Sequence, residues 1–434
     1  MDISVQGDKM KEFIKTHITD GVELVTVPAT RFKTNETAIS FVLALSEENA
    51  SKYALLINLL SHCSADYPDM LSLNKKLALL YGASLRASAV KTGESHVLTL
   101  YLSSLDDRFA IDGDSISIES VKLLLSLAFS PRLDEDGEFV ETDIEREKRL
   151  LIEKIESESS DKRLYALRRL EEEMFKGEPY AVNPLGDADM IKALSKQDIK
   201  EAYLDFVNNA DIWITTVGAA ENEEVAKICK STFVNIERTP LGIKKPGFVP
   251  YAENVKTVEE RQAVKQGKLV LGFRVNLDSD SDKADTMRVF CDVFGGGPYS
   301  KLFMNVREKL SLCYYCSARY NKRNSSIVIQ CGCEEENMDK AVKEILQQIE
   351  KIKNGDFESE FKSSVSSLCD SVKSVYDDSA YLLAWYIAQL TDSELLPPGA
   401  VIDSYEKTDF NGVKDCASLL SLDTVYKLMG EKEA

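Results

Sequence analysis

The chain has 434 residues, of which 44% are hydrophobic and 29% charged, and its formal net charge is −19. Its length exceeds what a single hydrophobic core supports, so two or more domains are expected, and its composition excludes a disordered protein. The negative charge argues against nucleic-acid binding, and the longest apolar runs fall far short of the roughly 18 residues that cross a bilayer.

Neither the N-terminus nor the cysteines indicate export. Residues Met1 to Asp8 lack the basic and apolar regions of a signal peptide. The nine cysteines are an odd number scattered over a long chain, which is not the pattern of a disulfide framework. We therefore expect a cytoplasmic protein whose cysteines are thiols, with no membrane partner.

An apolar strand followed by an apolar helix is predicted near the start of each half of the chain. In the first half, Ile39 to Leu45 predicts the strand and Tyr53 to His62 the helix. In the second half, Val270 to Leu277 and Ala284 to Phe294 have the same order and register. Because a repeat fixes the architecture, a duplication is the simplest interpretation.

A hairpin and a further helix follow in both halves. The predicted segments are Leu85 to Ala89, Thr99 to Leu102 and Ile118 to Ala128, and then Tyr314 to Ala318, Ile327 to Cys331 and Met338 to Ile352. Hairpins beside helices are typical of the α+β fold class. We expect two homologous domains, each a mostly antiparallel sheet with helices packed on one face.

A charged helical stretch occurs in the first half only. It runs from about Glu138 to Lys176 and is closed by Gly177-Glu178-Pro179, which a helix does not continue through. Such a charge run is typical of a solvated helix face, so no catalytic role is assigned to it.

The prolines and glycines of residues 240–250 predict a linker between the halves, because rigid elements end at such residues. The predicted domains are residues 1–235 and residues 260–434. Residues 236–259 are predicted to join them.

Motifs in both halves resemble the insulinase/pitrilysin family of zinc peptidases. Gly295 to Phe303, followed by Arg307 to Tyr314, is similar to the C-terminal domain of that family. Asn183-Pro184-Leu185-Gly186 and the apolar run Ile212 to Gly218 are similar to its N-terminal domain. The resemblance covers nearly the whole chain and implies an insulinase-like fold, with two domains forming half of a clam-shell around a peptide chamber.

Active members of the family carry an inverted zinc motif, H-x-x-E-H, on a helix. Two histidines four residues apart bind zinc through neutral imidazoles, and the glutamate between them activates the zinc-bound water. The matching positions in this chain read Asn58-Leu59-Leu60-Ser61-His62. The resemblance therefore implies a degenerate zinc site that lacks one ligand, at Asn58, and the general base, at Ser61.

The third zinc ligand of the family is a glutamate seven residues after another acidic residue on the same helix face. With Glu147 as the first acid, Lys154 stands at the ligand position, and an ammonium offers no lone pair to a metal. A shift of the match by one residue brings Glu153 to that position. The chain has three histidines in all, His17, His62 and His96, so no two-histidine helical site is possible, and neither a metal nor another cofactor is expected.

The substrate-binding pair of the family is kept. An arginine and, seven residues on, a tyrosine are matched by Arg307 and Tyr314. A guanidinium and a phenol can hold a peptide carbonyl and stabilise the oxyanion that develops on it. The resemblance implies a catalytically inactive subunit that binds peptide and forms a heterodimer with an active homologue, or self-associates, with zinc only in the active partner.

A narrower resemblance concerns two short segments. Phe32-Lys33-Thr34 and Leu80-Tyr81-Gly82-Ala83 are similar to the bacterial branch of the family that is linked to modification of translation elongation factor P.

Two other functions remain open. The chain could be an active zinc metallopeptidase with a non-standard site made of His62, Glu147 and Glu153. It could also be a purely structural peptide-binding homologue. Zinc content, and cleavage by the chain alone, separate the first from the second.

Four cysteines have a spacing that needs a second interpretation. Cys313-x-x-Cys316 with Cys331-x-Cys333 is similar to a zinc ribbon, but the second pair is too closely spaced for a zinc knuckle. Both pairs lie in predicted adjoining strands, where small apolar thiols are common. We therefore expect structural thiols here.

Overall fold

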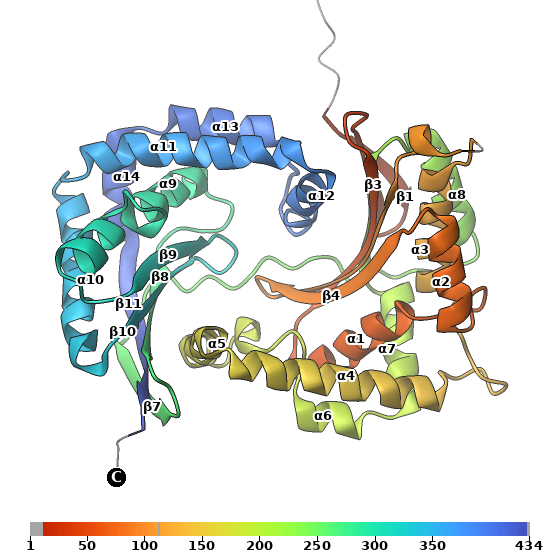
Figure 1. The fold of residues 1–434 in the computed structure, drawn as a ribbon, viewed down its shortest axis with the longest axis horizontal. Coiled ribbons are helices and arrows are strands. Elements are labelled where there is room, and N and C mark those ends of the chain that lie inside the picture. Colours follow the sequence, from red (N-terminus) through yellow and green to blue (C-terminus); the bar gives the residue numbers. More distant parts are fainter. Residues whose placement is uncertain (1–11, 112, 432–434) are drawn as a thin grey trace, which may run out of the picture.

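The computed structural model describes residues 12–111 and 113–431 and contains two β-sheets, one from each half of the chain (Figure 1). Residues Met1 to Asp8, on which the signal-peptide interpretation rests, lie outside the described residues. None of the described helices is both long and apolar enough to cross a lipid bilayer. All nine cysteines are free thiols, as predicted.

The first sheet has six strands in the order β1-β2-β6-β3-β5-β4, with only β2 and β6 parallel. Its strands are β1 (Ile14–Thr19), β2 (Val22–Pro28), β3 (Thr34–Ala44), β4 (Ser84–Thr92), β5 (Ser95–Leu105) and β6 (Asp211–Gly218). One face packs against α1 (Glu47–Leu60), α3 (Ile116–Phe129), α7 (Lys196–Asn208) and α8 (Asn222–Phe233). The same half contains α2 (Met70–Leu79), α4 (Glu141–Ser160), α5 (Lys162–Met174) and α6 (Ala188–Ala193).

The second sheet has five strands in the order β7-β11-β8-β10-β9, with only β7 and β11 parallel. Its strands are β7 (Lys256–Gln262), β8 (Gly267–Val275), β9 (Tyr315–Asn321), β10 (Ser326–Cys333) and β11 (Leu420–Gly430). One face packs against α9 (Ala284–Gly295), α10 (Met338–Lys353) and α14 (Phe410–Cys416). The same half contains the α-helices α11 (Glu358–Lys373), α12 (Ser379–Ile387) and α13 (Pro398–Lys407).

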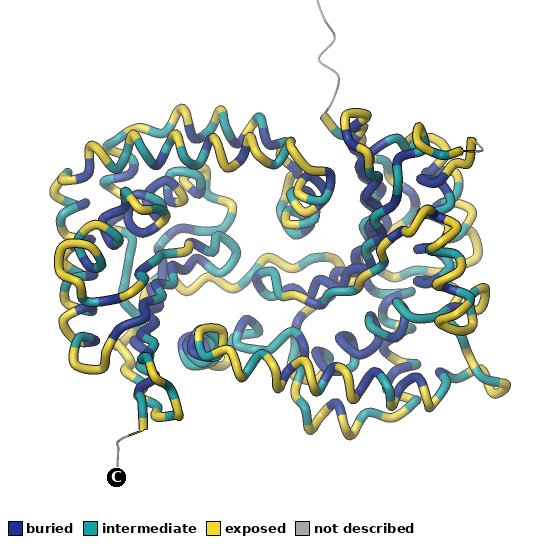
Figure 2. Tube along the Cα trace, in the orientation of Figure 1, coloured by how far each residue is buried: buried dark blue, intermediate teal, exposed yellow. Residues whose placement is uncertain are grey.

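The two sheets repeat one strand order. The series β2-β6-β3-β5-β4 corresponds to β7-β11-β8-β10-β9, and in both series the first pair is parallel and the others are antiparallel. The predicted α+β fold of two homologous halves is confirmed. The cores follow the apolar periodicity, and Figure 2 shows the buried residues concentrated along the sheets and the helix faces that contact them.

The expectation that helices pack on one face of each sheet is incomplete, because each half also covers the other half's second face. Leu382, Leu383 and Tyr386 of α12 pack on the first sheet against Val25 and Val217.

In return, α5 packs on the second sheet, where Ala166 and Leu170 contact the cluster of Val270 and Tyr426. A Cβ at Gly272 of β8 would overlap Met174 Sδ of α5, so this methionine side chain would have to move to admit a larger residue. Each half therefore contributes one helix to the other half: α12 covers the first sheet and α5 covers the second.

The predicted long charged helix is two helices. Asp161 has non-helical dihedrals, φ −76° and ψ 99°, and its side chain accepts hydrogen bonds from the backbone N–H groups of Arg163 and Leu164. This N-cap starts α5 on a new axis. The turn brings α5 onto the second sheet, so part of the supposed solvated face is buried.

Residues 234–255 contain neither helix nor strand, and β7 begins at Lys256, within the predicted linker. The segment is tied to both halves of the chain. Arg238 donates to the carbonyl of Asp20, and Lys245 forms ion pairs with Asp278 and Asp280 at 2.8 and 3.0 Å. The exact domain limits stay a prediction.

One buried histidine gives the fold a pH dependence. His96 of β5 is fully buried, and burial lowers its pKa from 6.5 to about 4, because the imidazolium would lose its hydration. The unfolded chain takes up this proton at higher pH than the folded chain. We expect the free energy of unfolding to fall by about 3 kcal/mol between pH 6.5 and pH 4 through this group.

Urea unfolding at a series of pH values measures this effect. In the His96→Leu variant the fall in that window should be smaller by this amount, whereas the exposed His17→Leu should behave as the unchanged chain. An identical pH dependence in His96→Leu and the unchanged chain would show that His96 does not carry it.

Candidate functional site

The degenerate zinc-motif positions lie at the C-terminal end of α1. The helix ends at Leu60, so Ser61 and His62 follow it, which corrects the expectation that the motif lies within a helix. The Ser61 hydroxyl donates to the Asn58 carbonyl at 2.7 Å, and His62 Nδ1 lies 2.8 Å from the same oxygen. Because a carbonyl only accepts, Nδ1 carries the proton, and His62 caps the helix.

A buried carboxylate lies beside this histidine. Glu147 of α4 is 2% exposed, and its Oε1 is 3.4 Å from His62 Nδ1. Arg146 Nε donates to the same oxygen at 2.9 Å. The negative charge of Glu147 is thus balanced by a guanidinium of the protein itself, at the place where the family resemblance expects a metal.

Two other candidates lie away from this cluster. Lys154 is exposed on α4, two turns beyond Glu147. Glu153 is also exposed and forms an ion pair with Arg149 at 2.9 Å. The structure therefore brings Asn58, Ser61, His62 and Glu147 together but leaves Lys154 and Glu153 outside.

The donors present do not fit a zinc ion. Asn58 turns its amide back to the Ala54 carbonyl at 2.9 Å, and Ser61 is occupied as a helix cap. A single imidazole and a carboxylate already paired with Arg146 are fewer ligands than zinc sites use. The absence of bound zinc stays a prediction, to be tested by metal analysis.

The predicted substrate-binding residues lie together in the second half. Arg307 belongs to the π-helical segment Leu302–Lys309, and Tyr314 directly precedes β9. Between them the chain turns through Ser311, whose φ of 52° is left-handed and strained for a residue with a Cβ. Both side chains line one surface pocket of about 390 Å³, together with Ser311 and Glu334.

The two side chains of this pocket have different surroundings. The Arg307 guanidinium lies over the Phe303 ring at 4.5 Å. Tyr314 is 60% exposed and donates its hydroxyl hydrogen to Glu334 Oε1 at 3.0 Å. This bond raises the pKa of Tyr314 and occupies the single hydrogen of its hydroxyl group. The pocket thus holds a guanidinium and a phenol beside the carboxylates of Glu308, 3.6 Å from Arg307 Nε, and Glu334, and a ligand can use Tyr314 as a donor only by replacing Glu334.

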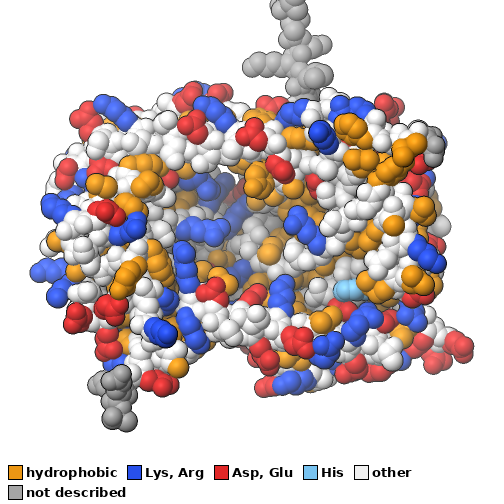
Figure 3. Space-filling model, viewed as in Figure 1, with side chains coloured by type: hydrophobic (Ala, Val, Ile, Leu, Met, Phe, Trp, Pro, Cys, Tyr) orange, Lys and Arg blue, Asp and Glu red, His pale blue; other side chains and the backbone are white. Residues whose placement is uncertain are grey.

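A larger cavity, of about 680 Å³, lies between the halves, and its lining residues were not predicted (Figure 3). Its basic lining residues are Lys91, Arg288, Arg319, Lys322 and Arg323, and its acidic ones are Asp285, Asp292 and Asp392. An excess of basic groups favours anionic ligands, although the whole chain is acidic. The cluster of Arg319, Lys322 and Arg323 in the β9–β10 hairpin was a sequence signal that could have indicated it.

Comparisons with known proteins cover both halves. Residues 193–366 match a family described as the Peptidase M16 inactive domain. The chain is 29% identical over 415 residues to the probable inactive metalloprotease YmfF of Bacillus subtilis (strain 168), covering 95% of this chain and 97% of that protein.

Solved structures with a similar fold also cover both halves of the chain. A conserved protein from Enterococcus faecalis V583 superimposes with a TM-score of 0.88 at 25% identity, and the match covers 98% of this chain and 100% of that protein. A Peptidase M16 inactive domain from Pseudomonas fluorescens gives a TM-score of 0.77 at 18% identity, covering 97% and 98% of the two chains. The similarity in fold therefore extends over nearly the whole chain.

Proposed function

Because this chain is a homologue of the insulinase-type (M16) peptidases without their two-histidine zinc motif, we propose that it is the non-catalytic subunit of a two-subunit peptidase. In this proposal an active homologue carrying H-x-x-E-H supplies the zinc and the water-activating glutamate. This chain supplies Arg307 and Tyr314, which bind the peptide across the cleft. It also provides one wall of the chamber.

The pocket of Arg307 and Tyr314 is the observation that carries the proposal. Both groups are hydrogen-bond donors, and both face a surface pocket rather than a packed core. A peptide carbonyl that becomes an oxyanion gains most from donors held in place before the reaction. Arg307 lies over Phe303 and Tyr314 is held by Glu334, and in this proposal the Tyr314 hydroxyl turns from Glu334 to the substrate oxygen when the peptide binds.

The contacts made by the zinc-motif positions also support a role for this chain that does not include zinc binding. Arg146 neutralises Glu147, and His62 serves as a helix cap, so both have structural roles that need no metal. A chain of this kind gains activity only from a partner that brings the zinc. The basic lining of the cavity between the halves supports a peptide with acidic groups as the bound molecule.

Zinc content and peptide hydrolysis test the proposal directly. The purified chain, alone and mixed with an H-x-x-E-H homologue encoded in the same genome, is assayed with a set of fluorogenic peptides. We expect less than ~0.1 zinc per chain and no cleavage by the chain alone, because one imidazole does not hold zinc tightly. Mixing should produce cleavage above that of the homologue alone.

The homologue mixed with bovine serum albumin is the control for nonspecific effects. Stoichiometric zinc and chelator-sensitive cleavage by the isolated chain would overturn the proposal and establish a non-standard active site. Partner activity that does not respond to this chain would instead leave a structural peptide-binding homologue.

A further inference from the structure

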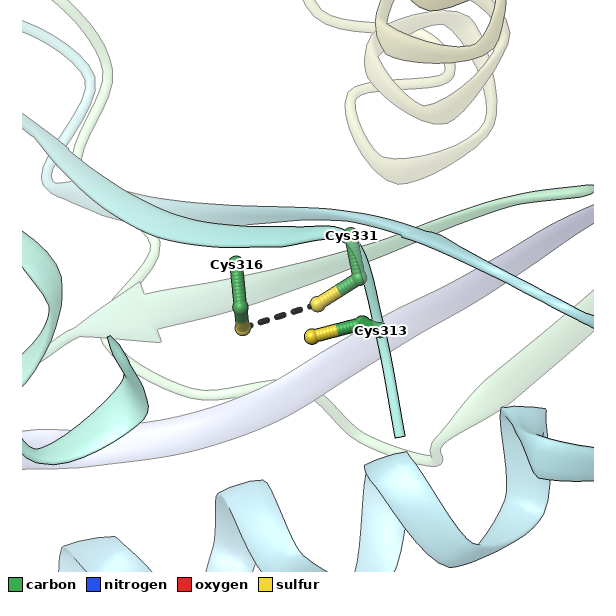
Figure 4. Close-up of side chains that lie close together, drawn as sticks. All are labelled: Cys313, Cys316 and Cys331. Carbon is green, nitrogen blue, oxygen red and sulfur yellow. Dashed lines mark hydrogen bonds between the residues drawn. The ribbon is translucent and has the colours of Figure 1, made fainter. Parts of the chain in front are cut away.

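Three cysteine side chains converge beside the Arg307 and Tyr314 pocket (Figure 4). Cys313 precedes β9, Cys316 lies in β9, and Cys331 lies directly opposite Cys316 in β10. The three sulfur atoms all lie within 4.8 Å of one another, and those of Cys316 and Cys331 are 2.8 Å apart. In residues 12–111 and 113–431, this is the one group of three or more potential metal ligands that the fold brings together.

The three thiols are not equally accessible. Cys316 and Cys331 are 5% and 0% exposed. Cys313 is 8% exposed and lines the surface pocket that also contains Arg307 and Tyr314. A small reagent that enters the pocket therefore meets Cys313 first, with two further thiols directly behind it.

The charge environment of the three thiols is also unequal. Hydrogen bonds from Cys316 and Cys331, together with the positive charge of Arg307, lower the pKa of Cys313. Burial raises the pKa of the cysteines outside the cluster, which are Cys63, Cys229, Cys291, Cys333, Cys369 and Cys416. Three sulfur atoms within 4.8 Å of one another, with Cys313 at a surface pocket, form the arrangement of an oxidisable pair rather than of inert core cysteines.

We propose that Cys313, Cys316 and Cys331 form a redox-responsive site, in which a hydroperoxide oxidises Cys313 and a neighbouring thiol then closes a disulfide with it. In the first step the Cys313 sulfur attacks one peroxide oxygen. The S–O bond forms, the O–O bond breaks, and the departing oxygen takes a proton and leaves as water or an alcohol. The sulfur is oxidised by two electrons to a sulfenic acid, and the peroxide is reduced.

The second step uses a thiol of the same cluster. The sulfur of Cys316 or Cys331 attacks the sulfenic sulfur, the S–S bond forms and the S–O bond breaks. The hydroxyl group takes the proton of the attacking thiol and leaves as water. Two molecules of a low-molecular-weight thiol restore the reduced state by disulfide exchange and become a disulfide themselves.

The disulfide would change the substrate pocket as well. Oxidation converts the Cys313 thiol, which lines the same pocket as Arg307, into a neutral disulfide sulfur. A disulfide to Cys331 would also tie the segment before β9, next to Tyr314, to β10. This effect on peptides depends on the proposed function, but the thiol chemistry does not.

Mass spectrometry after peroxide treatment tests the site. The reduced chain is exposed to limiting hydrogen peroxide, blocked with N-ethylmaleimide and digested. We expect a disulfide that joins Cys313 to Cys316 or Cys331, reversed by dithiothreitol, and loss of the Cys313 thiol at least ~10-fold faster than that of Cys369. The Cys369→Ser variant is the matched control and should react as the unchanged chain.

Two variants keep the test decisive. The Cys313→Ser variant should keep Cys316 and Cys331 as thiols at the same peroxide concentration. The Cys316→Ser/Cys331→Ser double variant should stop at the sulfenic acid of Cys313, which dimedone labels. The proposal fails if Cys313 reacts no faster than Cys369, if the disulfide lies elsewhere, or if the purified chain holds stoichiometric zinc on these cysteines.

Discussion

Replacing Arg307 by alanine is expected to lower kcat/KM of the mixed peptidase about 100-fold, while the zinc content of the active partner stays unchanged. The guanidinium is the fixed positive charge of the pocket and lies over Phe303 before any substrate binds. Its loss removes a donor from the developing oxyanion. Tyr314→Phe removes a single neutral donor, and we expect about a 10-fold decrease. Initial rates with a fluorogenic peptide measure both effects.

Matched variants separate a role in binding from a general loss of structure. Arg149 is exposed on α4, and Tyr381 is 63% exposed on α12. Arg149→Ala and Tyr381→Phe should leave the rate of the mixture unchanged. If Arg307→Ala also leaves it unchanged, the pocket does not contact substrate, and the structural homologue becomes the better account.

The largest expected loss of stability follows from replacing Arg274 by methionine. This arginine of β8 is 4% exposed, and it donates to Glu178 Oε1 at 2.6 Å and to Asp423 Oδ2 at 3.0 Å. It also donates to the carbonyl of Met174 at the end of α5. Removal of the cation leaves two carboxylates without their partner, which costs about 3–5 kcal/mol of unfolding free energy.

Urea unfolding followed by circular dichroism measures this loss. Arg149→Met, which breaks an exposed ion pair, is the control and should cost less than about 1 kcal/mol. A similarly small loss in Arg274→Met would mean that Glu178 and Asp423 are hydrated without the arginine. Arg274 would then not be a strong link between α5 and the second sheet.

The sequence predicts the elements of the fold better than their contacts. The predicted helix at Ala284 to Phe294 lies within α9, and the predicted strand at Ile39 to Leu45 covers the second part of β3 and runs one residue past its end, because apolar periodicity is a local signal. Which sheet α12 covers depends on residues far away in the chain, so no local pattern reveals it. The break at Asp161 was overlooked because a single capping residue barely alters the charge pattern around it.

Some features of the candidate site were predicted from the sequence and others were not, because the latter depend on contacts that the local pattern does not encode. The pairing of Arg307 with Tyr314 followed from the family motif, and the structure places both at one pocket. The helix end at Leu60 changed the role of His62, because the capping bond to Asn58 depends on where the helix stops. The cysteines were judged by their spacing along the chain, whereas their proximity depends on the β9–β10 register.

The exchange of α5 and α12 also bears on how such a protein can evolve. After a gene duplication, two copies of a domain can usually drift apart or be separated, since each buries its own core. Here each copy leaves an apolar sheet face, around Val25 and Val217 in one and Val270 and Tyr426 in the other, that only its twin can shield. Neither copy covers its own sheet completely, so the loss of either one would expose an apolar face on the other, whatever became of catalysis.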